Sequence, residues 1–74
     1  KITAVNDQLY LVKIDQGSNS GVEKGQIFDI FKEERAIAQA KVTQVRGDEA
    51  ALRVIEYYQE QSIDTDAIAK RVVP

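Results

Sequence analysis

GSNSGVEKGQIFDIF, residues 17–31, places three glycines four residues apart and then an alternating apolar run. Glycine adopts positive-φ conformations at little cost, so this spacing lets a backbone leave one strand, turn and enter another. We therefore predict a structural loop formed by Gly17, Gly21, Val22 and Gly25. In the strand that follows, Gln26–Lys32, Phe28 and Ile30 share one face and Ile27 and Phe31 the other. Phe28 is expected in the core.

The same period of two recurs on both sides of this segment. It predicts strands over Ile2–Val5, Leu9–Ile14, Ala36–Arg46 and Ala67–Val73, joined by turns at Asn6-Asp7, Glu33–Arg35 and Gly47-Asp48. Within Leu9–Ile14, Tyr10, Val12 and Ile14 are expected on one face. Within Ala36–Arg46, Val45 falls out of step with Ala38, Ala40 and Val42. This break predicts a β-bulge near Thr43-Gln44.

Residues 49–61 fit two structures. As a helix they have Asp48 as N-cap and an apolar stripe, and as a strand they direct Ala50, Leu52 and Val54 inward and Arg53 outward. Local propensity favours the helix slightly. The setting between short strands favours a strand through Ile55, followed by a looser or helical turn near residues 57–62, and this is our prediction.

About six short strands predict an all-β domain, a small six-stranded antiparallel barrel of the SH3-like or a similar type. Seventy-four residues suffice for one such domain, spanning 1–74. Alanines recur on the expected strands and suit a tight barrel with closely spaced walls. Because the first residue is lysine and no signal peptide is present, we expect a domain cut from a longer protein.

The composition excludes several classes of function. The chain has no cysteine and no histidine, so thiolate chemistry, disulfides and the commonest general base and metal ligand are all missing. The net charge of −2 argues against general nucleic-acid binding, which needs a basic face. No apolar run approaches the roughly 20 residues that cross a bilayer, so membrane insertion is not expected.

None of the short motifs predicts catalysis, a cofactor or a metal. The glycine spacing matches neither the phosphate-binding loop nor the dinucleotide fingerprint. Asp64-Thr65-Asp66 lacks the further ligands of a calcium loop, and Glu33-Glu34 lacks the burial that a catalytic carboxylate pair needs. Both pairs are interpreted as solvated turns. Ser18, Ser20 and Ser62 have no histidine to activate them.

Two sets of surface residues are candidates for binding. Phe31, Tyr57 and Tyr58 could form an exposed patch for a protein partner, although the residues alone favour a role in capping the open ends of a barrel. A second set would suit RNA only if it shared a face with exposed aromatic residues; it consists of Lys41, Arg46, Arg53, Lys70 and Arg71.

Residues 6–31 and two later segments resemble a small all-β domain of bacterial cell-envelope proteins. This family includes the C-terminal domain of the flagellar H-ring assembly protein T, and a related loop occurs in rod-shape-determining protein C. The matching features are the G-S-x-x-G-V-x-x-G loop at 17–25 with its following strand, the strand at 37–45 and the closing segment at 62–72. Thr65 stands where the pattern has glycine, which puts the tight turn there in doubt.

The resemblance implies a non-enzymatic structural or protein-interaction module that faces the periplasm and contacts other subunits or domains of its parent protein. Two other functions remain open from the residues alone. One is a nucleic-acid-binding barrel, and the other is an accessory domain of an enzyme.

Overall fold

The computed structural model describes residues 2–6, 8–58 and 63–72. Six strands follow in order: β1 (Ile2–Asn6), β2 (Leu11–Ile14), β3 (Ile27–Lys32), β4 (Arg35–Val45), β5 (Ala50–Tyr57) and β6 (Ile68–Arg71). A 3₁₀ turn, η1 (Ser18–Ser20), lies between β2 and β3. The predicted all-β class is confirmed.

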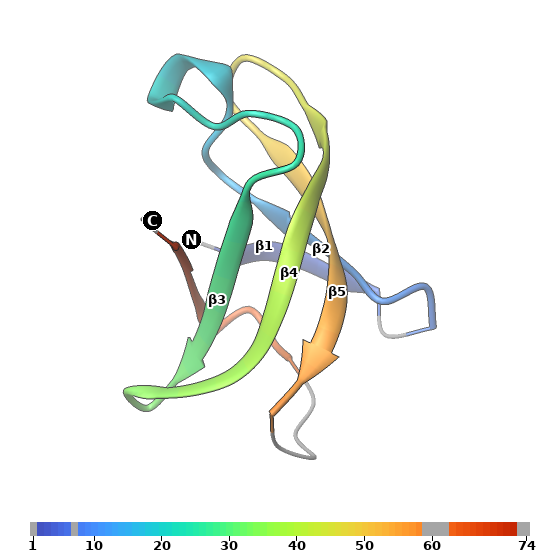
Figure 1. Cartoon of the computed structure of the whole chain (residues 1–74), viewed down its shortest axis with the longest axis vertical. Helices are drawn as coiled ribbons and strands as arrows, with labels where there is room; N and C mark the ends of the chain where they lie inside the picture. The colour runs from blue at the N-terminus through green and yellow to red at the C-terminus, as the bar shows by residue number, and fades with distance from the viewer. Residues whose placement is uncertain (1, 7, 59–62, 73–74) are drawn as a thin grey trace.

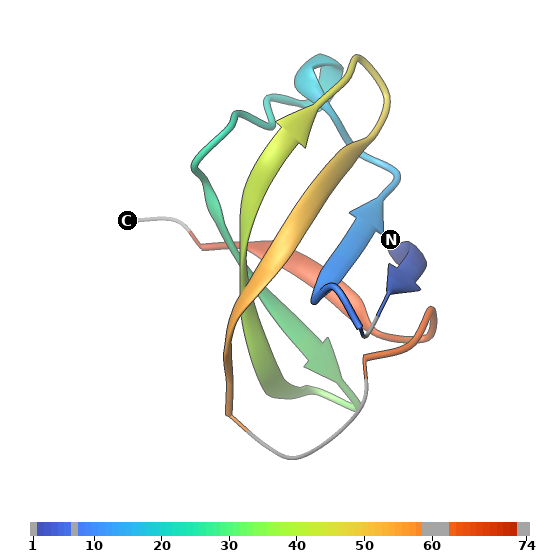
Figure 2. The same ribbon diagram turned by 90° about the vertical axis from the view of Figure 1, so that its right-hand side faces the viewer.

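The strands form one antiparallel sheet in the order β1-β2-β5-β4-β3-β6. β3, β4 and β5 lie side by side across the front of Figure 1, with β1 and β2 behind them. Figure 2 shows how strongly the sheet twists and curls, which produces a half-barrel. No ladder joins β1 to β6 among the residues that the structure describes, so these two strands are the edges of the sheet.

Alternation along the strands explains the core. β4 buries Ala38, Ala40 and Val42, and β5 buries Ala50, Leu52 and Val54. Across the ladder between the two strands, Ala40 pairs with Val54 and Val42 pairs with Leu52. The small alanines let the two walls of the curled sheet approach closely. The whole core cluster is Ile2, Val12, Ile14, Val22, Phe28, Ile30, Ile37, Ala38, Ala40, Val42, Ala50, Leu52, Val54, Ile63 and Ala67.

Most strand predictions are confirmed, including the one for the ambiguous segment. Residues 50–57 form a strand that directs Arg53 outward. The strand continues through Tyr57, so a helical turn does not begin there. Residues 59–62 of that expected turn lie outside the described residues, as do Asp7 of the first turn and Val73 of the last strand.

The bulge near Thr43-Gln44 is confirmed, because the β4–β5 register shifts between Val42 and Gln44. Further register shifts, which the sequence did not predict, occur at Ile37 of β4, at Ile55 of β5 and between Ile2 and Ala4 of β1. The prediction of a strand over Leu9–Ile14 is wrong at Leu9 and Tyr10, because β2 begins at Leu11. They lie in the turn before β2, where Tyr10 has φ 55° and an exposed side chain instead of an inward one. Tyr10 fails to follow the alternation because the chain is still turning there.

Candidate functional site

The glycine loop packs against the turn between β4 and β5. The backbone N–H of Ser18 donates to the Arg46 carbonyl at 2.8 Å, and that of Asn19 donates to the Gly47 carbonyl at 2.9 Å. Gly21 and Gly25 have positive φ angles of 83° and 94°. Gly17 is extended, with φ −141°, and is buried in the packing of the two loops.

Three side chains hold this loop in place, two from the loop region and one from β6. Val22 is inserted in the core with 2% of its surface exposed. The Gly21 carbonyl accepts hydrogen bonds from the Arg71 guanidinium at 2.9 Å and from the Gln26 amide at 3.3 Å. Because Arg71 belongs to β6, it ties the last strand to the loop. These contacts are structural and offer no ligand chemistry.

Four exposed, bulky apolar side chains lie where β5 ends and the turn before β2 begins. We call this surface the apolar corner, and it consists of Leu9, Tyr10, Ile55 and Tyr57, which are 40–58% exposed. The rings of Tyr10 and Tyr57 meet edge to face with their centroids 6.4 Å apart. The Tyr10 carbonyl accepts a hydrogen bond from the Val54 N–H at 2.7 Å, which fixes the turn against β5. Tyr57 was a predicted contact residue, but the other three were not.

Phe31 and Tyr58 do not join Tyr57. They lie near Asp29, on the outer face of the sheet that is directed away from the core: Phe31 follows Asp29 by two residues on β3, and Tyr58 contacts the Asp29 carboxylate. Lys70 lies over the Phe31 ring, with its Nζ 5.3 Å from the centroid. Tyr58 hydrogen-bonds Asp29, and its pKa is raised by partial burial and by the carboxylates of Asp29 and Glu56. The predicted aromatic patch is therefore divided between two surfaces, because adjacent residues of a strand point to opposite faces.

The five basic residues considered for RNA binding do not form one continuous face. Arg71 donates to the glycine loop, Lys70 lies over Phe31, and the Arg46 Nε is 3.9 Å from the Glu49 carboxylate. Only Lys41 and Arg53 are direct cross-strand neighbours. Both are exposed, and neither has an ion-pair partner among the described residues.

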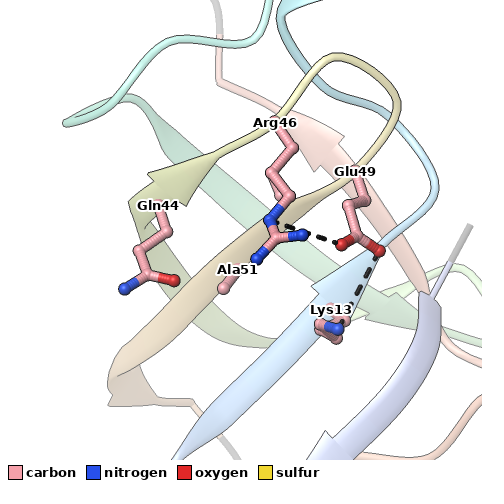
Figure 3. A pocket seen from close by; sticks show the side chains of 6 residues that line it. Lys13, Gln44, Arg46, Glu49 and Ala51 are labelled. Atoms are coloured by element: carbon pink, nitrogen blue, oxygen red, sulfur yellow. Dashed lines mark ion pairs between the residues drawn. The ribbon is translucent and has the colours of Figure 1, made fainter.

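A shallow groove runs over the outer face of β1, β2, β5 and β4. One hollow is lined by Lys13, Gln44, Arg46, Glu49, Ala50 and Ala51, as Figure 3 shows. A second is lined by Ala4, Val5, Asn6, Leu11, Lys13, Gln44 and Ala51. The shared Lys13, Gln44 and Ala51 make the two hollows continuous. Glu49 lies between Arg46 and Lys13, 3.9 Å from each.

The acidic pairs lie at turns, as expected. The Asp64 carboxylate accepts a hydrogen bond from the Asp66 N–H at 3.0 Å, which closes the turn despite threonine at position 65. The Lys32 ammonium is 2.9 Å from Asp64 and holds the pKa of this carboxyl below its usual value. In the described part of the chain, no cluster of acidic side chains is arranged to hold a metal ion.

No helix among the described residues is long and apolar enough to cross a membrane. No protein-family model, no curated protein and no solved structure matches the chain.

Proposed function

We propose that this domain is a non-catalytic protein-interaction module that docks through the apolar corner to another subunit, or to another domain of its parent protein. The observation that carries the proposal is the grouping of Leu9, Tyr10, Ile55 and Tyr57, each 40–58% exposed, at one end of the sheet. Scattered apolar side chains are ordinary on a protein surface, but a contiguous group marks an interaction site.

The corner has the properties of a binding surface. Tyrosine gives a large contact area and has few rotatable bonds, so little entropy is lost when its ring is immobilised. The Tyr10–Tyr57 contact and the Val54–Tyr10 hydrogen bond hold the patch in one arrangement before any partner arrives. Such preorganisation lowers the cost of association.

The setting that we propose is a bacterial cell-envelope assembly of the flagellar type, with the domain in the periplasm. The support for it is the resemblance of the 17–25 loop and the 37–45 strand to the envelope family described above. Fractionation of the source cells tests this setting separately, because a protein found only in the cytoplasmic fraction would contradict it.

The docking surface is tested with a photocrosslinking amino acid placed at position 57 of the parent protein, in cells of the source organism. We expect discrete adducts that protease removes and nuclease does not. The same amino acid at Lys24, which is exposed on the glycine loop, is the matched control and should give none. Absence of adducts from position 57, or adducts removed by nuclease, would overturn the proposal.

A variant checks that the surface itself makes the contact. Changing Tyr10→Ser and Tyr57→Ser together should remove adducts formed from a photocrosslinker at position 55. The circular dichroism spectrum should stay that of the wild type, because both rings are 40% or more exposed. Adducts that persist at wild-type yield would show that the tyrosines do not contribute to docking.

A further inference from the structure

We infer that the outer-face groove binds an extended, acidic peptide segment of a partner protein. The inference rests on the proposed function, because it names the chemistry of a second contact made by an interaction module. The groove is separate from the apolar corner in its residues and in its charge.

The first argument is an unneutralised pair of like charges. Lys41 and Arg53 are direct neighbours across the β4–β5 ladder, and both side chains are exposed. Like charges opposite each other destabilise a sheet. Glu56 is the nearest carboxylate along β5, and it forms no ion pair with either residue in the described structure. An anionic partner would relieve this repulsion.

The second argument is the register of the neighbouring strands. Arg53 pairs with Leu11 of β2, and Lys13, two residues along that strand, pairs with Ala51. Lys13 therefore lies diagonally across from Arg53 on the same face. Two cations, Lys13 and Arg46, line the groove together with one carboxylate, Glu49. Arg53 borders the groove through its pairing with Leu11, and Lys41 lies next to Arg53 on the far side from β2. This surface is positively charged, although the chain as a whole has a net charge of −2. It is therefore complementary to an acidic ligand.

The third argument is the looseness of the internal ion pairs. The Glu49 carboxylate is 3.9 Å from both the Lys13 ammonium and the Arg46 guanidinium. Dashed lines in Figure 3 mark these two ion pairs. Charge-assisted hydrogen bonds are about 2.7–2.9 Å long, so both contacts are weak. A carboxylate of a ligand can compete with Glu49 for these two cations.

The shape of the groove favours a peptide over a nucleic acid. Ala4, Leu11 and Ala51 line the second hollow, and Ala51 also lines the first, so an extended chain with small side chains between its acidic ones suits the groove. Single-stranded nucleic acids are held by bases stacked on aromatic rings, and neither hollow is lined by an aromatic residue.

The test measures binding of a fluorescent ten-residue peptide of alternating glutamate and alanine, with an oligothymidylate of ten nucleotides as the competing class. We expect the peptide to bind at low ionic strength and to be released at ~0.3 M salt, where exposed charges are screened. Lys41→Glu with Arg53→Glu should weaken binding about tenfold or more. Lys24→Glu with Arg35→Glu changes the net charge equally, at sites outside the groove, and should leave the affinity within about twofold.

Two further variants guard against misfolding and test the looseness of the Glu49 pairs. Lys41→Gln with Arg53→Gln should also weaken binding of the peptide. The melting temperature should stay equal or rise, because the repulsion between the two positive charges is removed. Glu49→Gln frees Lys13 and Arg46 and should tighten binding about twofold to threefold, whereas Glu23→Gln in the glycine loop should not.

Three results would overturn the inference: no peptide binding, tighter binding of the oligothymidylate, or equal losses in the groove and control variants. Because the crosslinks from position 57 are measured independently, their persistence beside a failed peptide assay would reject the acidic ligand and leave the interaction module standing. Absence of both the crosslinks and the peptide binding would reject the acidic ligand and the interaction module together.

Discussion

The three glycines of the 17–25 loop meet different physical requirements. Gly21 and Gly25 need positive φ, and a Cβ at Gly25 would contact nothing within 4 Å, so conformation alone selects glycine there. Gly17 has an ordinary extended backbone. A Cβ at Gly17 would lie 2.0 Å from the Arg46 carbonyl oxygen and 2.7 Å from the Glu49 nitrogen, so close backbone approach selects this one.

Gly17→Ala is therefore expected to lower the free energy of unfolding by about 2–3 kcal/mol, because the added methyl group must push two backbones apart. That is a large share of the roughly 3–5 kcal/mol available to a domain of this size. Urea denaturation followed by circular dichroism measures the loss.

Gly47→Ala is the matched control, in the turn against which Gly17 packs. Its Cβ would meet only the Asn19 side-chain amide, at 3.2 Å, and that group can move away. The expected cost is below about 1 kcal/mol. Equal effects of the two substitutions would show that the loops are not packed as closely as described.

Asp64 links the turn before β6 to the end of β3 and makes stability depend on pH. Its hydrogen bond to Lys32 lowers its folded pKa below the ordinary 3.8. The contribution of Asp64 to the free energy of unfolding is therefore complete above its unfolded pKa. This contribution is lost as the pH falls through the lower pKa of the folded state. Lys32 is shifted upward from 10.5 by the same contact, so its contribution is complete below that value and is lost as the pH rises through the raised pKa.

Asp64→Asn should be less stable than the wild type at pH 7, and the difference should shrink as the pH falls through the lowered folded pKa of Asp64, where the carboxyl of the wild type becomes protonated. Asparagine keeps an oxygen for the Asp66 N–H, so the difference isolates the charge. Asp48→Asn, at the exposed turn after Gly47, is the control for a lost carboxylate. A stability gap between Asp64→Asn and the wild type that is unchanged from pH 7 to pH 2 would argue against the ion pair.

Among the elements, the β3–β4 hairpin contains an unusual turn. Its two loop residues, Glu33 and Glu34, have φ angles of 50° and 68°. Two-residue hairpin loops of type I′ need positive φ at both positions, and they favour Asn-Gly for that reason. The hairpin forms here because Phe28 and Ile30 pair with the buried alanines of β4, so strand packing outweighs the cost of the turn.

Glu33→Asn with Glu34→Gly should raise the free energy of unfolding by about 1 kcal/mol, since both new residues tolerate left-handed backbone. Thermal and urea unfolding measure the gain. Glu33→Gln with Glu34→Gln removes the same charges and keeps the strain, so little change is expected. A similar gain in both variants would assign the effect to charge repulsion instead of conformation.

The sequence predicts the strands well because alternation is a local property. Phe28, Ile30, Leu52 and Val54 identify their own faces, and Val45 reveals one bulge by falling out of step. The register shifts at Ile37 and Ile55 leave no such mark in the sequence, because they depend on which strand pairs with which. The candidate binding surfaces are harder to predict from the sequence than the bulges. Leu9 and Tyr10 join Tyr57 only through the pairing of β2 with β5, a contact between residues more than forty positions apart.

At the scale of the whole molecule, the order of the strands separates a rigid centre from two exposed edges. β4 and β5 are paired on both sides, and their buried residues provide much of the core. Within residues 2–6, 8–58 and 63–72, β1 and β6 are each paired on one side only. The edges also differ in charge, because β6 contains Lys70 and Arg71 whereas β1 contains no charged residue. Charged side chains on an edge discourage pairing with another sheet.

This arrangement predicts the order of amide hydrogen exchange. Amides of β4 and β5 should exchange only through global unfolding, with protection equal to the full free energy of unfolding. Amides of β1 should exchange through local opening and should be less protected, because fraying breaks a single ladder. Exchange followed by NMR, at several protein concentrations, measures both classes. If β1 amides matched those of β4 and their protection rose with concentration, the uncharged edge would be paired with a second copy of the chain. Equal protection independent of concentration would instead mean that the sheet closes between β1 and β6 in solution.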